Sequence, residues 1–108
     1  MKYHNSKITT PDGTFDSKHE LQRWGELKIM ERAGIIEQLK RQVRFDLVPA
    51  QPRDGLIPAE RGVSYIADFT YLKNGELVVE DAKGYKTAEY IIKRKLMRWI
   101  HKVVIKEV

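Results

Sequence analysis

Apolar and polar residues alternate along parts of the chain, and a period of two predicts β-strands. In residues 42–47 every second side chain is apolar. Residues 65–72 and 77–79 are two further apolar or β-branched runs. Asn74 and Gly75 lie between them, and this pair favours a tight turn because both central positions need a positive φ. We therefore expect one strand at 42–47 and an antiparallel hairpin formed by the later two runs.

Two other segments have apolar residues at spacings of three and four, which is the pattern of an amphipathic helix. The first helix is predicted over residues 18–33. Ser17 and Glu20 match a capping box at its start, and Gly34 suits a helix end. The second helix is predicted over residues 87–101. The apolar positions expected to face the core are Leu21, Trp24, Leu27 and Met30, then Tyr90, Ile91, Ile92, Leu96, Trp99 and Ile100.

A short buried strand is expected at residues 103–105, so the predicted order is helix, three strands, helix, strand. The hairpin strands are antiparallel, and the last strand must return to the sheet through a helical crossover. We therefore expect an α/β fold with a mixed central sheet flanked by helices. It should occupy residues 17–108 as one domain, since a chain of this length builds a single modest core.

Two segments are predicted to lie outside that core. Residues 1–16 are polar and basic, with a hairpin across the turn at residues 11–13, and we expect a mobile arm or edge ribbon. Residues 49–62 contain three prolines and two glycines, so we expect an irregular, flexible loop. That loop is either a disordered insertion or a basic flap that reaches over a nucleic-acid backbone with Arg53 and Arg61.

Composition narrows the classes of protein and partner. The chain has 20 lysines and arginines against 15 acids, a net charge of +5, which is compatible with a polyanionic partner. It has no cysteine, so disulfides and thiolate zinc sites are excluded. No apolar run reaches the roughly 20 residues that span a bilayer, and no signal peptide is visible. We expect a cytoplasmic protein without a membrane partner, in the host cytoplasm if it is phage-encoded.

The end of the predicted hairpin combines acids with a lysine. Because side chains alternate faces along a strand, Asp81 and Lys83 should share one face and Glu80 the other. If Asp68 of the partner strand lies on the same face as Asp81, two carboxylates and an ammonium group converge. Such an oxygen-rich cluster suits Mg²⁺ or Mn²⁺. A register slip of one residue would exchange Glu80 for Asp81, and a plain surface hairpin with exposed salt bridges is the alternative.

Asp68, followed after a hairpin by Asp-Ala-Lys at residues 81–83, resembles the PD-(D/E)xK nuclease signature. Ala67 stands where that signature has proline. The predicted order of elements over residues 17–108 is also similar to that of the superfamily. Its spacing is most like that of Holliday-junction resolvases and their small phage-associated relatives. The resemblance implies a restriction-endonuclease-like αβββαβ core.

The resemblance also implies an activity and a set of site residues. The activity is that of a metal-dependent, structure-selective DNA endonuclease of the phage Holliday-junction resolvase type. The implied catalytic residues are Glu20, Asp68, Asp81 and Lys83, and the implied ligands of Mg²⁺ or Mn²⁺ are the three acids and the Ala82 carbonyl. Lys83 would orient the attacking water or offset phosphate charge. Glu20 is equally the N3 residue of the capping box, and Gln42 is either a supporting site residue or a solvated edge residue.

Carboxylates this close repel each other, so at least one of them should have a raised pKa.

The second predicted helix carries many cations and few acids, which favours phosphate as a counterion. The predicted DNA contacts are Lys86, Lys93, Arg94, Lys95 and Arg98, with Arg53 and Arg61 from the loop. Either Lys93 or Lys95 could instead turn into the active site. A four-way junction offers two symmetric scissile phosphates, so we expect a homodimer, formed through the first helix or the sheet edge. The alternatives are another PD-(D/E)xK nuclease (repair, transposase-like or restriction-like) and a basic DNA-binding accessory protein without turnover.

Overall fold

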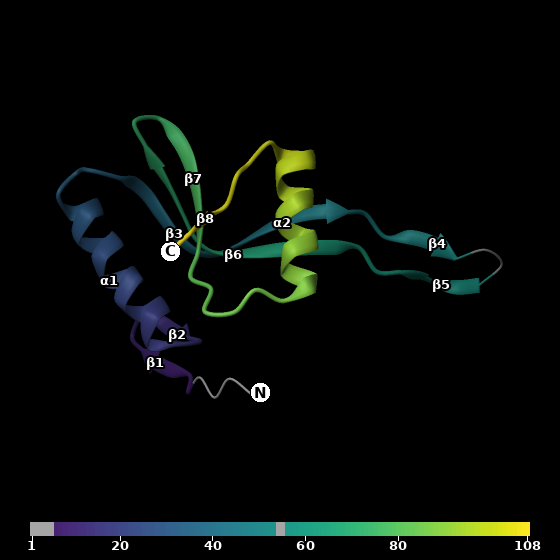
Figure 1. Ribbon diagram of the computed structural model, residues 1–108, viewed down its shortest axis with the longest axis horizontal. Helices are drawn as coiled ribbons and strands as arrows, with labels where there is room; N and C mark the ends of the chain where they lie inside the picture. Colours follow the sequence, from purple (N-terminus) through teal and green to yellow (C-terminus); the bar gives the residue numbers. More distant parts are fainter. Residues whose placement is uncertain (1–5, 54–55) are drawn as a thin grey trace.

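A mixed four-stranded sheet lies between two helices in the computed structural model, which describes residues 6–53 and 56–108 (Figure 1). The strand order is β3-β6-β7-β8, with β3 at Glu37–Val48, β6 at Val63–Lys73, β7 at Glu76–Asp81 and β8 at Lys106–Glu107. The β3–β6 and β6–β7 pairs are antiparallel and the β7–β8 pair is parallel. The predicted α/β class, the mixed sheet and the hairpin across Asn74 and Gly75 are therefore confirmed.

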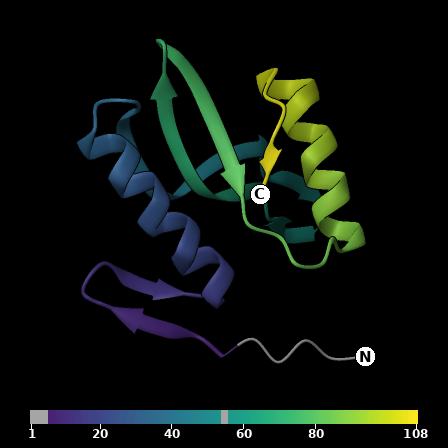
Figure 2. The ribbon, with the colours of Figure 1, turned by 60° about the vertical axis from the view of Figure 1, so that its left-hand side comes forward.

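Both predicted helices are present, and they flank the sheet from opposite sides (Figure 2). Helix α1 covers Lys18–Arg32, and its N-cap Ser17 accepts a hydrogen bond from the backbone N–H of Glu20. Helix α2 covers Ala88–His101 and is capped in the same way by Thr87. These side chains satisfy backbone amides that have no partner within the first turn of a helix.

The N-terminal hairpin is present as β1 (Ile8–Thr10) and β2 (Gly13–Phe15), while residues 1–5 of the predicted arm lie outside the described residues. The expectation that this ribbon stays outside the core was wrong for Phe15, which is fully buried. The Arg41 guanidinium lies 3.7 Å from the centre of the Phe15 ring. Because Phe15 belongs to β2 and Arg41 to β3, this cation–π contact holds the ribbon against β3.

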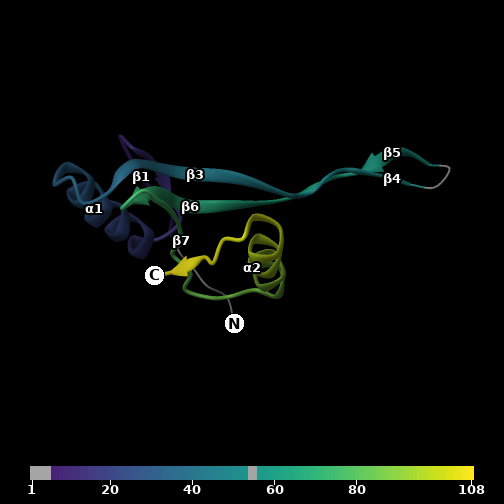
Figure 3. The ribbon, with the colours of Figure 1, turned by 90° about the horizontal axis from the view of Figure 1, so that it is seen from above.

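The prediction of an irregular loop at residues 49–62 was wrong. The segment contains strands β4 (Gln51–Arg53) and β5 (Leu56–Glu60), which pair antiparallel. Strands β3 and β6 run on into this ribbon, which projects far beyond α2 (Figure 3). A two-stranded ribbon tolerates proline because each strand has an edge that needs no N–H donor. Of the two arginines predicted here, the Arg53 side chain lies outside the described residues and Arg61 is exposed.

Two hydrophobic clusters hold the helices to the sheet. The first joins α2 to the sheet through Leu47, Tyr65, Ala67, Val79, Tyr90, Met97 and Ile105. The second joins α1 to the sheet through Leu27, Ile36, Phe69 and Tyr71. The predicted core face of α2 was wrong in part, since Trp99 is 76% exposed and Ile92 is 58% exposed. Met97 is buried instead, because it lies two turns after Tyr90 on the same face of the helix.

The last strand also differs from the prediction, because it forms at Lys106–Glu107 rather than at 103–105. Lys102 ends α2 in a left-handed conformation with φ 61°. The next three residues carry the chain back to the sheet, where Lys106 pairs with Glu80. Of these three, Ile105 is buried but Val104 is 69% exposed.

Candidate active site

The register of the β6–β7 hairpin brings Asp68 and Asp81 to the same place. The pairing includes Phe69 opposite Glu80, and Asp68 and Asp81 are the next residues outward. Asp68 Oδ2 accepts a 2.9 Å hydrogen bond from the backbone N–H of Ala82. Lys83 Nζ lies 3.6 Å from Asp81 Oδ2. The two carboxylates and the ammonium group therefore converge at the end of the hairpin, in the arrangement that side-chain alternation predicted.

Glu80 points to the opposite side of the sheet, toward α1. Arg23 donates to both of its carboxylate oxygens, at 2.8 Å from Nε and 2.7 Å from Nη2. The Tyr71 hydroxyl donates to it as well. Burial acts to raise the pKa of Glu80, but the hydrogen bonds from Arg23 and Tyr71 outweigh it and keep that pKa below its usual value. Glu80 therefore belongs to a buried ion pair, and Asp81 is the acid beside Asp68.

Glu20 is buried at the start of α1, with 2% of its surface exposed. Its Oε1 accepts a 2.9 Å hydrogen bond from the backbone N–H of Asp16, one residue before the N-cap that a capping box would use. Its Oε2 lies 3.5 Å from Arg41 Nη2. Burial raises the pKa of Glu20, and the negative charge of Asp68 adds to the effect. One carboxylate oxygen thus caps the helix while the other faces Arg41 and Asp68.

Gln42 connects the helix acid with the strand acid. Its Nε2 lies 3.4 Å from Glu20 Oε2 and 3.4 Å from Asp68 Oδ1. The residue has φ 53°, a left-handed conformation that is uncommon for a side chain other than Gly, Asn or Asp. Gln42 is exposed on the edge strand β3, as the solvated-edge interpretation predicts, and its amide group also reaches both acids.

The surroundings of Asp68 and Asp81 offset little of the negative charge that the two carboxylates would carry. Burial raises the pKa of Asp68 to about 7, and the neighbouring Asp81 carboxylate acts in the same direction. Asp81 Oδ1 is also buried, and it has no hydrogen-bond partner among the described residues. The pKa of Asp68 and of Glu20 is raised, as predicted, but burial is the largest cause and repulsion between carboxylates a smaller one. A cation would relieve both the repulsion and the lack of a partner.

A hollow of about 370 Å³ opens over this cluster, lined by Glu20, Asp68, Ala82 and Lys83 together with Ser17 and Tyr85. A second hollow of about 300 Å³ adjoins it across Lys83 and is lined also by Ser64 and Lys93. Lys93 thus borders a hollow next to the carboxylates, while Lys95 is exposed on another side of α2. Of the two lysines considered for the site, Lys93 is the one placed near it.

Among residues 6–53 and 56–108, no three acidic, histidine or cysteine side chains stand close enough together to form a ready metal cage. The donor chemistry nevertheless fits a hard cation, because the available groups are carboxylate oxygens and the Ala82 carbonyl. The partnerless Asp81 Oδ1 is the atom whose environment most favours such an ion. Glu20, held by the backbone N–H of Asp16 and contacted by Gln42, lines the same hollow as Asp68.

The sequence did not reveal one buried neighbour of Asp81. Tyr65 donates a 2.7 Å hydrogen bond from its hydroxyl to Asp81 Oδ2. Nothing in the sequence distinguishes Tyr65 from the other apolar positions of its strand, because a buried tyrosine shows its partner only in three dimensions.

The predicted DNA contacts fall into two groups. Lys86 and Arg94 lie 3.9 and 2.8 Å from carboxylate oxygens of Glu107, and Lys93 lies 3.2 Å from Glu89. Lys95, Arg98 and Arg61 are exposed and have no acidic partner in the described part of the chain. The second group therefore offers the cations that remain available for phosphate.

A family model described as "Protein of unknown function (DUF1064)" matches residues 1–106. The chain belongs to the DUF1064 family. No curated protein and no solved structure matches this DUF1064 protein. In the described residues of this family member, neither α1 nor α2 is long and apolar enough to cross a membrane.

Proposed function

We propose that this DUF1064 protein is a metal-dependent DNA endonuclease with a PD-(D/E)xK core. The observation that carries the proposal is one hollow lined by Glu20, Asp68 and Lys83, with the buried Asp81 beside Asp68 and Lys83. The order α1, β3, β6, β7, α2, β8 supports it, since the acid, the hairpin and the acid-x-Lys segment follow in the sequence of that nuclease core.

Each residue has a distinct role in the proposed reaction. Glu20, Asp68, Asp81 and the Ala82 carbonyl would hold Mg²⁺ or Mn²⁺, which lowers the pKa of bound water and offsets negative charge on the phosphate. Lys83 projects beside Asp81 and would orient the attacking water or stabilise charge on the phosphate in the transition state. Gln42 would keep the carboxylates of Glu20 and Asp68 in place through its amide group.

The preferred substrate in this proposal is branched DNA, in particular a four-way junction. A single 12.6 kDa chain carries one site, and a junction presents two equivalent scissile phosphates, so a two-fold homodimer suits the substrate. Helix α1 and the residues after it offer exposed apolar side chains for such a contact, with Ile29 67% and Ile35 52% exposed.

The proposal is tested by incubating the protein with Mg²⁺ and a synthetic four-way junction, a flap and a plain duplex. We expect paired cuts at mirrored positions of the junction and none in the duplex. Asp81→Asn should abolish cutting while junction binding persists, and Asp46→Asn, on an exposed strand position, is the matched control. Undiminished cutting by Asp81→Asn would rule out this site, and cutting of flap or duplex alone would indicate a repair, transposase-like or restriction-like nuclease.

A second candidate is a basic DNA-binding accessory protein that keeps the fold without turnover. The observation in its favour is that the described residues hold no preformed group of three metal-binding side chains. Junction binding without cleavage in Mg²⁺ and in Mn²⁺, together with no metal-dependent stabilisation, would support this candidate over the nuclease.

A further inference from the structure

Helix α2 has an apolar stripe on the side that faces solvent. Tyr90 and Met97 fix the buried side of the helix, at 5% and 0% exposure. Ile92 and Trp99 are also seven residues apart and so share another face, where they are 58% and 76% exposed. A tryptophan this exposed is unusual, because its ring has a large apolar surface to bury. The stripe therefore indicates a surface that a partner covers.

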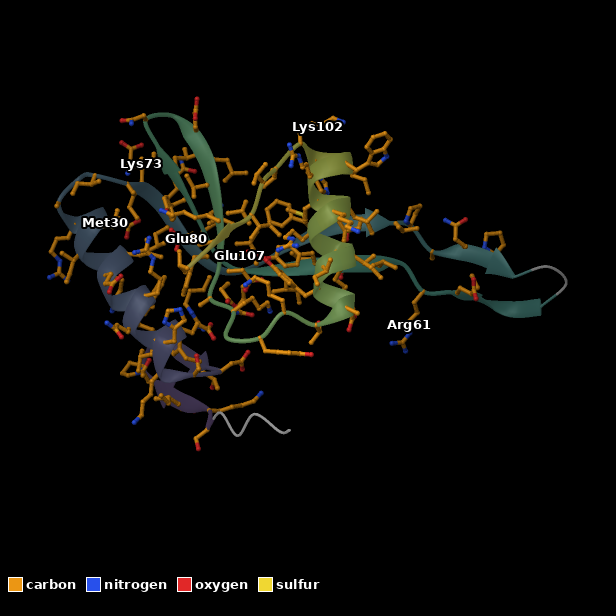
Figure 4. All side chains as sticks on the ribbon, in the orientation of Figure 1. Met30, Arg61, Lys73, Glu80, Lys102 and Glu107 are labelled. Atoms are coloured by element: carbon orange, nitrogen blue, oxygen red, sulfur yellow. The ribbon has the colours of Figure 1, made fainter. Side chains whose placement is uncertain are left out.

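The same face carries cations without acidic partners. Lys95 and Arg98 are exposed, and in the described part of the chain neither pairs with a carboxylate. Lys102 Nζ lies 5.3 Å from the centre of the Trp99 indole ring and donates a 2.8 Å hydrogen bond to the Trp99 carbonyl. Figure 4 shows Lys102 at the C-terminal end of α2. Lys102 therefore contacts the exposed ring, and Lys95 and Arg98 add two exposed cations from the same turns of α2.

The charge of this surface selects among possible partners. A second copy of the chain, docked by the same face, would bring Lys95, Arg98 and Lys102 against identical cations, which is unfavourable. A lipid surface fits less well, because the exposed apolar side chains described on α2 and just after it, Ile92, Trp99, Ile100 and Val104, do not lie on one face: Ile100 is about 100° around the helix from Trp99. A nucleic acid matches both features, since its phosphates attract the cations and its bases stack on aromatic rings.

We propose that Trp99 stacks on an unpaired nucleobase while Lys95, Arg98 and Lys102 contact the adjoining phosphates. This deepens the proposed function by naming the part of the substrate that α2 recognises, namely unpaired bases at a branch point or strand end. A paired base inside a duplex is already stacked on both faces and so leaves the indole without a ring to contact. The inference rests on the proposed function only in taking nucleic acid as the partner, and it requires no cleavage.

The first test uses the fluorescence of Trp99 itself. The chain contains only two tryptophans, so Trp24→Phe leaves Trp99 as the sole indole. This variant is titrated in EDTA with a single-stranded oligonucleotide, a four-way junction and a blunt duplex, after circular dichroism has established that it is folded. We expect strong quenching by the single strand and the junction and weak quenching by the duplex. Unchanged fluorescence with all three would overturn the inference.

The second test measures affinity in the otherwise unaltered chain, by anisotropy of labelled junction DNA in EDTA. Because stacking on one base contributes on the order of 1–3 kcal/mol, Trp99→Ala should weaken binding by roughly 5-fold to 150-fold. Trp99→Phe keeps an aromatic face and should restore most of the affinity. Leu77→Ala, which removes an exposed apolar side chain from β7, should bind as the parent does.

Charge and stacking are separated by the salt dependence of binding. Lys95→Ala/Arg98→Ala removes two phosphate contacts. The negative slope of log K against log salt should therefore become less steep by about 1.5. Trp99→Ala should leave that slope unchanged, and Lys40→Ala/Lys73→Ala is the control for lost surface charge. The inference is overturned if Trp99→Ala binds like the parent, if it instead dissociates a dimer, or if Trp99 responds to anionic vesicles and not to DNA. Failure of cleavage alone would overturn the nuclease proposal and leave this one standing.

Discussion

The Tyr65 hydroxyl donates a 2.7 Å hydrogen bond to Oδ2 of Asp81, and both side chains are buried. Burial and the neighbouring Asp81 charge strongly raise the pKa of Tyr65, so the hydroxyl remains a neutral donor at physiological pH. The bond fixes one carboxylate oxygen, while Oδ1 has no hydrogen-bond partner among the described residues. Tyr65 therefore orients Asp81 through one carboxylate oxygen and leaves the other without a hydrogen bond.

Tyr65→Phe removes that hydrogen bond and keeps the ring in the core. Because Asp81 loses a buried donor, we expect the free energy of unfolding to fall by about 1–3 kcal/mol, measured by urea denaturation. Cleavage should slow because the carboxylate is no longer held in one orientation. Tyr71→Phe is the matched control, since it removes the hydroxyl that contacts Glu80 and should lower stability without a specific effect on cleavage. Equal cleavage by Tyr65→Phe and the parent would contradict the orienting role.

The raised pKa of Asp68 predicts how stability depends on pH. Since the folded-state pKa is about 7 against an ordinary value of 3.8, the folded protein keeps a proton that the unfolded chain releases between these values. The free energy of unfolding should therefore fall as pH rises from about 4 to about 7 in EDTA. Asp68→Asn should remove most of this fall and be more stable than the parent at pH 8, by roughly 1–3 kcal/mol.

The measurement is urea denaturation at a series of pH values in EDTA. Asp46→Asn, which changes an exposed carboxylate paired with Arg44, should keep the slope of the parent. Glu20, whose pKa is also raised, adds to the fall in the same direction. A stability that rises with pH over this window in the parent would contradict the assignment of Asp68 as a poorly compensated buried acid.

Metal binding should stabilise the fold by mass action. At a metal concentration near 100 times the dissociation constant, the free energy of unfolding rises by about 2.7 kcal/mol. For a domain of this size the melting temperature then rises by roughly 10 °C. We expect this shift with Mn²⁺ at pH 8, measured by differential scanning calorimetry, and its loss in Asp68→Ala. A shift of the same size in Asp68→Ala would place the ion elsewhere, and no shift in the parent would favour the accessory protein.

The Arg23–Glu80 pair is expected to be structural. Arg23→Ala leaves the carboxylate of Glu80 buried without its main partner and should cost about 3 kcal/mol of stability in urea denaturation. Arg32→Ala, in the exposed last turn of α1, should change stability by no more than about 0.5 kcal/mol. Glu80→Gln should lower stability but keep metal-dependent cleavage at temperatures where it is folded, and selective loss of cleavage would place Glu80 in the site.

Local sequence patterns determined most of the secondary structure of this protein. Ser17 and Thr87 begin the two helices, because each side chain caps a free backbone amide. The Asn74 and Gly75 turn has positive φ at both residues, 54° and 78°, and it fixed the hairpin register that separates Asp81 from Glu80. These features depend on interactions between residues close in the chain, and so they could be predicted from the sequence.

The candidate site could be predicted in its composition but not in its environment. Asp68, Asp81 and Lys83 follow from strand alternation, and Glu20 followed from a resemblance to a nuclease superfamily. The hydrogen bond from Tyr65, the contact of Gln42 with two acids and the position of Lys93 beside the hollow come from packing between elements distant in the chain.

Tertiary packing also decided the outcomes that the sequence predicted wrongly. Trp99 was expected in the core because it is apolar. Tyr90 and Met97 pack against the sheet instead, and this rotation of α2 about its axis turns Trp99 to the solvent. Proline-rich residues 49–62 looked irregular, but long strands on both sides extended their pairing into a ribbon. The sequence by itself determined the elements and the acidic residues of this protein, since caps, turns and alternation act locally. Only the fold decided which side chains are buried, paired or exposed, because these depend on neighbours that the chain meets after it has folded.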